Sequence, residues 1–271
     1  MRAGLVRPLF CALLMLASPA QAIALPDLFP QQAASYLLMR DGTPLAARAA
    51  DVPRPIASLT KMLTALLLLE SGRSLDEVVS VSRDAAAETG SRLKLQVGDQ
   101  LTLDALLSAT LIASANDACH VLADALAGSE AQFVLQMNAR ASKLGFTHFH
   151  AMNACGHDAP GHVATARELA ALALTVMQQP RYVELSSLTQ KTIHTVGRHP
   201  REFKLVNSNA LIGRYPGAAG VKTGSTPEAG LCLAAFVLRE SHWVLLVLLD
   251  APDRWWTAVA MLDHAFAHAA P

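Results

Sequence analysis

The sequence predicts an α/β fold of the layered α+β kind, in which a mainly antiparallel sheet is flanked by helices. Three observations support this prediction. A strand hairpin pattern lies near the start of the chain, a mostly helical stretch follows, and strand-like segments with one last helix complete it. The 271 residues are 52% hydrophobic and 16% charged, so the chain can bury a substantial core and is unlike a disordered protein. We expect one domain over residues 23–271, with a helical subdomain at about 71–165.

The first predicted elements are a hairpin and a buried helix. Residues 36–39 and 44–47 have the character of short strands around the tight turn at Asp41-Gly42. Residues 56–70 are apolar nearly all round, which is typical of a helix that is buried on every side. Four further segments are expected to be helical: residues 103–112, 117–127, 130–143 and 164–177.

After the predicted helices, the sequence pattern changes from helical to strand-like. Four strand-like segments follow one another: residues 191–196, 203–206, 231–238 and 243–249. Residues 254–268 return to a helical pattern. A hairpin, then helices, then strands and a closing helix give the predicted layered arrangement.

The net charge and the N-terminal residues indicate which partners and which location to expect. Twenty-two basic and 22 acidic side chains give a formal net charge of zero, so a broad nucleic-acid-binding surface is not expected. Residues 1–22 have the positive start, short apolar run and Ala20-Gln21-Ala22 cleavage pattern of a secretory signal peptide. A retained membrane anchor is the alternative, but the apolar run is too short to span a bilayer. We therefore expect an exported protein.

Removal of the signal peptide leaves three cysteines, Cys119, Cys155 and Cys232. An odd number leaves at least one thiol unpaired, and the spacing suggests neither a disulfide framework nor a zinc site. A Cys119–Cys155 pair is compatible with an oxidising compartment, but the sequence does not decide it. Because all three lie in apolar surroundings, packing as small hydrophobic residues is the favoured interpretation.

The first candidate site is Ser58-Leu59-Thr60-Lys61 in the apolar segment 56–70. On a helix, residues three apart share a face, so Ser58 and Lys61 are expected to lie side by side. Burial lowers the pKa of a lysine and makes its neutral amine available as a base for a serine nucleophile. The alternative is a helix that contains serine and lysine by chance, but a buried lysine without a role is costly.

Two other polar groups complete the candidate set. Ser114-Ala115-Asn116 stands between two apolar helices, where a hydroxyl and an amide could relay a proton and hold a substrate amide, although Ser114 could also be a helix N-cap. Lys222-Thr223-Gly224 precedes an apolar strand, so it is expected on or beside a sheet edge. Gly224 would let another backbone approach closely there.

The three groups in this order resemble the S-x-x-K, S-x-N and K-T-G motifs of penicillin-binding proteins and serine β-lactamases. Their surroundings, residues 55–62, 113–118 and 220–226, resemble the low-molecular-mass D-alanyl-D-alanine carboxypeptidases. The resemblance runs from about residue 35 to 268. It implies a β-lactamase/transpeptidase-like fold and a periplasmic enzyme that removes the terminal D-alanine from peptidoglycan stem peptides. It also implies inhibition by β-lactams and no cofactor or metal.

The resemblance assigns roles to individual residues. Ser58 would attack the peptide carbonyl and Lys61 would take its proton, while Ser114 and Asn116 would assist proton transfer and position the substrate. Lys222 would stabilise the site electrostatically. The residues that would contact the substrate lie at the end of the K-T-G motif and at one distant arginine: Thr223, Gly224, Ser225 and Arg254. The amides of Ser58 and Ser225 would form the oxyanion hole.

Some features depart from the family pattern or leave alternatives open. Ala115 stands where the carboxypeptidases usually have glycine, and no β-rich second domain or amphipathic anchor follows residue 268, so no stable membrane anchor is expected. A D,D-endopeptidase that cuts cross-links is the alternative function, while a β-lactamase or an inactive cell-wall-binding scaffold is less favoured. Glu168 matches a helix start rather than a deacylating base. His157 and His162 are expected to be solvated.

Overall fold

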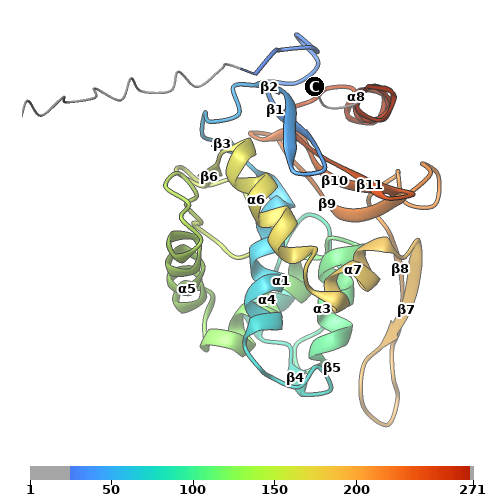
Figure 1. The fold of residues 1–271 in the computed structure, drawn as a ribbon. Helices are drawn as coiled ribbons and strands as arrows, with labels where there is room; N and C mark the ends of the chain where they lie inside the picture. The colour runs from blue at the N-terminus through green and yellow to red at the C-terminus, as the bar shows by residue number, and fades with distance from the viewer. Residues whose placement is uncertain (1–24, 269–271) are drawn as a thin grey trace, which may run out of the picture.

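The centre of the structure is a five-stranded antiparallel sheet, described here from a computed structural model that covers residues 25–268 (Figure 1). Its strand order is β2-β1-β11-β10-β9, so the first hairpin of the chain pairs with the last strand. Every neighbouring pair is antiparallel, which confirms the predicted sheet type. The strands are β1 (Ser35–Arg40), β2 (Thr43–Arg48), β9 (Ala218–Thr226), β10 (Gly230–Arg239) and β11 (His242–Leu249).

Both faces of this sheet are covered, which explains why β11 is almost continuously apolar. Leu246 and Leu248 pack in a cluster with α8 (Arg254–Ala267), whereas Leu245 and Val247 pack toward the helical part of the molecule. Figure 1 shows α8 on one side of the sheet and α6 (Ala166–Val176) on the other. Alternate side chains of one strand therefore enter two separate cores.

The helical part surrounds α1 (Lys61–Glu70), which packs against α3, α4, α5 and α6. Two of these helices, α3 and α5, begin at the predicted residue, and α6 begins two residues later than predicted. Local caps fix all three starts, because Thr102, Ser129 and Thr165 each accept a hydrogen bond from a backbone amide of the first turn. The bounds are α3 (Leu103–Ile112), α4 (Asn116–Ala127) and α5 (Glu130–Lys143). Glu168 completes a capping box with Thr165, in agreement with its predicted place at a helix start.

Two expectations for the helical part are wrong. Residues 56–70 are not one helix, because a 3₁₀ turn, η1 (Ala57–Thr60), precedes α1, and Ala57 has a φ of 47°. The stretch from residue 71 to 102 is not helical either, since it carries only a short α2 and the small pair β4 with β5. These elements are β4 (Val78–Ser80), α2 (Arg83–Ala86) and β5 (Gln100–Thr102).

The remaining strands lie outside the central sheet. β7 (Gln190–His194) and β8 (Glu202–Val206) form a separate two-stranded ribbon that projects beside α3 (Figure 1). β3 (Arg54–Pro55) and β6 (Val163–Ala164) make a minimal second pair. α7 (Pro180–Ser187), which the sequence did not indicate, begins with a proline and packs against β9.

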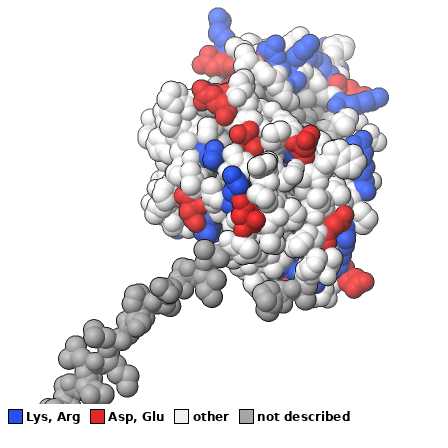
Figure 2. All heavy atoms as spheres, turned by 90° about the horizontal axis from the view of Figure 1, so that it is seen from above, with Lys and Arg blue, Asp and Glu red and all other residues white. Residues whose placement is uncertain are grey.

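Two features of residues 25–268 concern the surface: the distribution of charged side chains on one face and the length and apolarity of the helices. Acidic and basic side chains are interspersed on the face seen in Figure 2. Within residues 25–268, no helix combines the length and apolarity needed to cross a membrane. The predicted signal peptide, residues 1–22, lies outside the described residues.

Candidate active site

The first group of the site stands at the junction of η1 and α1. Lys61 is completely buried at the start of α1, and its Nζ donates a 2.9 Å hydrogen bond to Ser58 Oγ in η1. The same ammonium nitrogen donates to Asn116 Oδ1 at 2.7 Å and to the carbonyl oxygen of Cys155 at 2.5 Å. Ser58 and Lys61 are therefore side by side as predicted, and the buried amine has three acceptors.

The surroundings of Lys61 shift its protonation toward the neutral amine. Burial lowers its pKa to about 7, although the negative charges of Glu88 and Asp117 act in the opposite direction. A substantial fraction of Lys61 is then neutral near pH 7, and a neutral amine can accept the proton of a neighbouring hydroxyl.

The second group links α3 to α4. Ser114 has a φ of 57°, a left-handed conformation that ends α3, and its Oγ accepts a 2.8 Å hydrogen bond from Lys222 Nζ. The N-cap alternative for Ser114 is wrong, because Ala115 occupies that position and makes no side-chain cap. Asn116 follows as the first residue of α4, and its Nδ2 donates to the Thr89 carbonyl at 2.6 Å.

The third group lies on β9, which is an edge strand of the sheet, in agreement with its expected place on or beside a sheet edge. Lys222 is 2% exposed, and its pKa is held well below the ordinary value by burial and by the positive charges of Lys61 and Arg254. Thr223 Oγ1 lies 2.6 Å from Ser208 Oγ. This strand passes next to η1, so the two lysines, two serines and the amide belong to one site.

Gly224 allows β9 to approach η1 closely. A methyl group placed on Gly224 would lie 3.0 Å from the amide nitrogen of Ser58 and 3.1 Å from the carbonyl oxygen of Ile56. This close backbone approach was expected of Gly224. Ser225, the next residue, is exposed near the end of β9, the strand that packs against η1.

Arg254 lies at the start of α8 and reaches the backbone of the sheet. Its Nη1 donates to the carbonyl oxygens of Gly224 at 2.8 Å and Cys232 at 3.0 Å. Its Nε is buried and has no hydrogen-bond partner among residues 25–268. The arginine therefore supports the strand that carries Gly224.

Several residues of the site were not found from the sequence. The carbonyl groups of Cys155 and Thr89 hold Lys61 and Asn116, and backbone groups leave no residue-type signal. Gly156 has a φ of +87°, and a methyl group there would lie 2.0 Å from the Ala57 carbonyl oxygen. A glycine directly after Cys155 is the one sequence signal that could have indicated this close approach of the Cys155 loop to η1.

The cysteine and histidine expectations need correction. Cys119 of α4 and Cys155 form a disulfide, with Cα atoms 5.9 Å apart, so packing describes only the buried thiol of Cys232. His162 is 3% exposed rather than solvated, because its Nε2 lies 2.7 Å from Thr60 Oγ1 in η1. His157 is paired with Glu88, with 2.7 Å between His157 Nε2 and a Glu88 oxygen.

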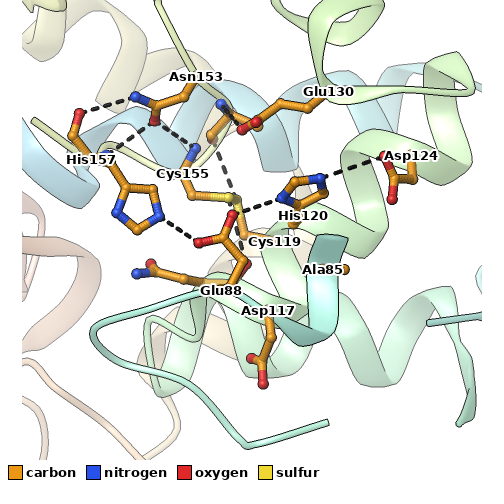
Figure 3. Close-up of polar contacts among 12 residues, drawn as sticks. Ala85, Glu88, Asp117, Cys119, His120, Asp124, Glu130, Asn153, Cys155 and His157 are labelled. Carbon is orange, nitrogen blue, oxygen red and sulfur yellow. Dashed lines mark hydrogen bonds and ion pairs between the residues drawn. A yellow bond between two sulfur atoms is a disulfide. The ribbon is translucent and has the colours of Figure 1, made fainter. Parts of the chain in front are cut away.

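One cluster of side chains near the site has metal-ligand chemistry. Glu88, His120 and Glu130 bring one potential ligand atom each within 4.8 Å of one another. Each already has a partner, however: both Glu88 oxygens face imidazole nitrogens, and Glu130 accepts a hydrogen bond from the Ala154 amide (Figure 3). We therefore interpret the cluster as a hydrogen-bonded network.

Comparison with known proteins agrees with this geometry. The family model of D-alanyl-D-alanine carboxypeptidase, peptidase S11, matches residues 22–253. A D-alanyl-D-alanine carboxypeptidase of Bacillus subtilis is 33% identical over 78% of this chain, which spans 56% of that protein's length. The D-alanyl-D-alanine carboxypeptidase of Streptomyces sp. K15 is 32% identical over 93% of this chain and 92% of its own.

A solved structure is similar over the same range. The crystal structure of the Streptomyces K15 DD-transpeptidase has a TM-score of 0.83 and 30% identity, and it matches 88% of this chain and 98% of the solved one. This likeness confirms the predicted β-lactamase/transpeptidase-like fold. The chain belongs to the D-alanyl-D-alanine carboxypeptidase family of serine peptidases.

Proposed function

We propose that the chain is a serine D,D-carboxypeptidase that removes the terminal D-alanine from peptidoglycan stem peptides through an acyl-enzyme on Ser58. The observation that carries this proposal is the 2.9 Å contact between Ser58 Oγ and the fully buried Lys61, whose pKa is about 7. Family membership supports the substrate class.

In the proposed acylation step, Ser58 Oγ attacks the carbonyl carbon between the two D-alanines, and its proton passes to the neutral amine of Lys61. The amides of Ser58 and Ser225 stabilise the negative oxygen that forms, a contribution that is often about 3–4 kcal/mol per donor. When the tetrahedral intermediate collapses, the bond to the nitrogen of the terminal D-alanine breaks. The proton that Lys61 took from Ser58 is passed to the leaving amine through Ser114, whose Oγ accepts a hydrogen bond from Lys222, and Lys61 is neutral again.

In deacylation, water attacks the ester carbonyl, a proton returns to Ser58 Oγ, and the shortened peptide is released. Lys61 is the proposed base here too, because its Nζ stays within hydrogen-bond distance of Ser58 Oγ. Asn116 is proposed to orient both the lysine and the substrate amide, since its Oδ1 already accepts from Lys61.

The terminal carboxylate of the substrate is proposed to bind at Thr223, beside the amide of Ser225. Thr223 Oγ1 is fixed by Ser208, and the Lys222 amine donates to the Thr223 carbonyl at 3.0 Å. Gly224 leaves the space that a side chain would fill. Arg254 supports this carboxylate site by holding the Gly224 carbonyl.

The proposed partners and location follow from this substrate. Peptidoglycan stem peptides are the substrate, and β-lactams, which present a strained amide to the same nucleophile, are the proposed inhibitors. Residues 1–22 support export to the periplasm. A D,D-endopeptidase activity is the second candidate, because a D-alanyl-D-alanine endopeptidase of Pseudomonas aeruginosa is 34% identical over 87% of this chain and 76% of its own.

Release of free D-alanine from a pentapeptide ending in D-Ala-D-Ala tests the main proposal, with Ser58→Ala as the control. We expect release by the unaltered protein and none by the variant. A protein that leaves the pentapeptide intact and instead cuts a cross-linked muropeptide dimer would replace the carboxypeptidase with the endopeptidase.

A further inference from the structure

Two loops hold the Lys61–Asn116 pair, and each does so with a backbone carbonyl. Asn116 Nδ2 donates to the Thr89 carbonyl at 2.6 Å, and Lys61 Nζ donates to the Cys155 carbonyl at 2.5 Å. Because loop carbonyls move with their loops, the positions of these two side chains depend on how the loops are fixed.

Both loops converge on one carboxylate, Glu88, the residue before Thr89. Its Oε1 lies 2.7 Å from His120 Nδ1 on α4, and its Oε2 lies 2.7 Å from His157 Nε2 (Figure 3). His157 stands two residues after Cys155. Glu88, His120 and His157, here called the Glu88 clamp, thus connect the segment before Thr89, helix α4 and the Cys155 loop.

The Cys155 loop is stiff enough to transmit this connection. Asn153 Oδ1 accepts hydrogen bonds from the amides of Gly156 at 2.7 Å and His157 at 3.0 Å, and Asn153 Nδ2 donates to the His157 carbonyl. The Cys119–Cys155 disulfide ties the same loop to α4. A shift of His157 would therefore shift the carbonyl that holds Lys61.

We propose that Glu88 is a positioning residue of the reaction, which holds the Thr89 and Cys155 carbonyls, and through them Asn116 and Lys61, in the arrangement that faces Ser58. The inference rests on the proposed function of Ser58 and Lys61. The side chains of Glu88 and His120 are only 11% and 10% exposed, so the contacts between them are shielded from water.

The charge of Glu88 gives this role a measurable signature. The charged and titratable groups around it are His120, Asp124 and Asp117 of α4, Glu130 of α5, His157, Lys61 and Arg92, which donates to the Glu88 carbonyl. Burial alone would raise the pKa of Glu88, but the two histidines lower it to about 2, so it is an anion throughout the neutral range. Its charge raises the pKa of Lys61 against the effect of burial.

Glu88→Gln and Glu88→Ala test the proposal, with Asp84→Asn as the matched control. Asp84 is an exposed acid of the same segment, and within residues 25–268 its side chain makes no hydrogen bond or ion pair with Glu88, His120 or His157. Acylation by a fluorescent penicillin and D-alanine release are measured from pH 5 to 9 in the presence of EDTA. Glu88→Ala is expected to lower the acylation rate constant about tenfold to hundredfold, the range for residues that orient a functional group through another.

Glu88→Gln is expected to lose less activity, because an amide of the same shape can still meet one histidine. The acid limb of its pH–rate profile, where the acylation rate falls as Lys61 becomes protonated, should nevertheless move to lower pH, since Lys61 loses a neighbouring negative charge. In both variants kcat should fall more than KM changes. His157→Gln, which leaves Glu88 and His120 paired, supplies a milder variant if Glu88→Ala fails to fold, and it should slow acylation by an intermediate factor.

The proposal is overturned if the Glu88 variants and His157→Gln lose melting temperature but keep the acylation rate and acid limb of Asp84→Asn. That result would give Glu88 a purely structural role. Failure of the proposed function looks different, because the unaltered protein would then form no acyl adduct at all.

Discussion

Two buried lysines dominate the electrostatics of the site at the residue scale. Lys61 and Lys222 are both removed from water, and the positive charge of Lys61 makes protonation of Lys222 less favourable. Each is hydrogen-bonded to a serine, Lys61 to Ser58 and Lys222 to Ser114. A neutral amine next to each hydroxyl is the state that burial favours.

This electrostatic state predicts the pH dependence of acylation. Because the pKa of Lys61 is lowered to about 7, the reactive neutral amine is lost as the pH falls below that value. The acylation rate constant should rise roughly tenfold per pH unit up to about pH 7 and then level off. Stopped-flow measurement with a fluorescent penicillin checks this.

Lys61→Arg is the control, because a guanidinium stays charged throughout this range. It should lose the acid limb together with about two to four orders of magnitude in rate. A rate constant for the unaltered protein that does not change from pH 5 to 9 would rule out Lys61 as the base.

His162 contributes to stability through its neutral form. The Met152 amide donates to its Nδ1, so Nε2 carries the hydrogen that faces Thr60 Oγ1, and Thr60 Oγ1 donates in turn to the Ala57 carbonyl. Burial lowers the pKa of His162 to about 4, below the ordinary value of 6.5. The unfolded chain therefore takes up a proton before the folded protein does.

Stability should accordingly fall as the pH is lowered from about 6.5 to 4, by up to about 3 kcal/mol from this group. Urea unfolding at pH 7 and pH 4 checks this against His162→Gln, which cannot titrate. The variant should lose less stability between the two pH values. Equal losses in both proteins would mean that His162 does not carry the effect.

At the scale of elements, the site depends on how closely η1 is approached by its neighbours. Gly156 and Gly98 have nearly the same left-handed φ, +87° and +85°, but different surroundings. A methyl group on Gly156 would lie 2.0 Å from the Ala57 carbonyl oxygen and 2.9 Å from the Ser58 amide nitrogen, whereas a methyl group on Gly98 would meet nothing within 4 Å.

Alanine at these two positions separates backbone strain from steric displacement. Gly98→Ala should cost about 1 kcal/mol from the unfavourable φ alone and leave acylation unchanged. Gly156→Ala should cost roughly 1–3 kcal/mol more and slow acylation, because η1 must move. Thermal unfolding and penicillin acylation are the measurements, and equal effects at both positions would contradict the proposed packing around Ser58.

The disulfide between α4 and the Cys155 loop acts at the same scale. It closes a loop with a sequence separation of 36 residues, for which the chain-entropy model gives a stabilisation of roughly 3–4 kcal/mol. Reductant should lower the melting temperature of the unaltered protein but not that of Cys119→Ala/Cys155→Ala. A melting temperature that reductant leaves unchanged in the unaltered protein would show that the bond is absent or without effect.

At the scale of the whole molecule, the elements that depend on local signals could be predicted. α3 and α5 have the predicted bounds, because capping residues and apolar periodicity act within one turn. β9 was only partly anticipated, since Lys222, Thr223 and Gly224 are polar or small yet buried, and a strand of this kind shows no alternation.

What the sequence did not decide depends on contacts between distant segments. The partner that buries His162 is Thr60, 102 residues away, and the disulfide forms only because α4 lies against the Cys155 loop. The 3₁₀ turn at Ser58 likewise depends on Gly156 and Gly224, which fit against it from two other parts of the chain. Residue types alone could indicate the three reactive groups, but not the carbonyls that hold them.

The central claim is that Ser58 is an acylatable nucleophile, and intact-mass spectrometry after incubation with a penicillin tests it most directly. The account predicts a persistent adduct of one drug mass on the unaltered protein and none on Ser58→Ala. Intact drug without an adduct would contradict the claim, as would an adduct that persists on Ser58→Ala. Drug consumed without a persistent adduct would contradict slow deacylation and indicate a β-lactamase.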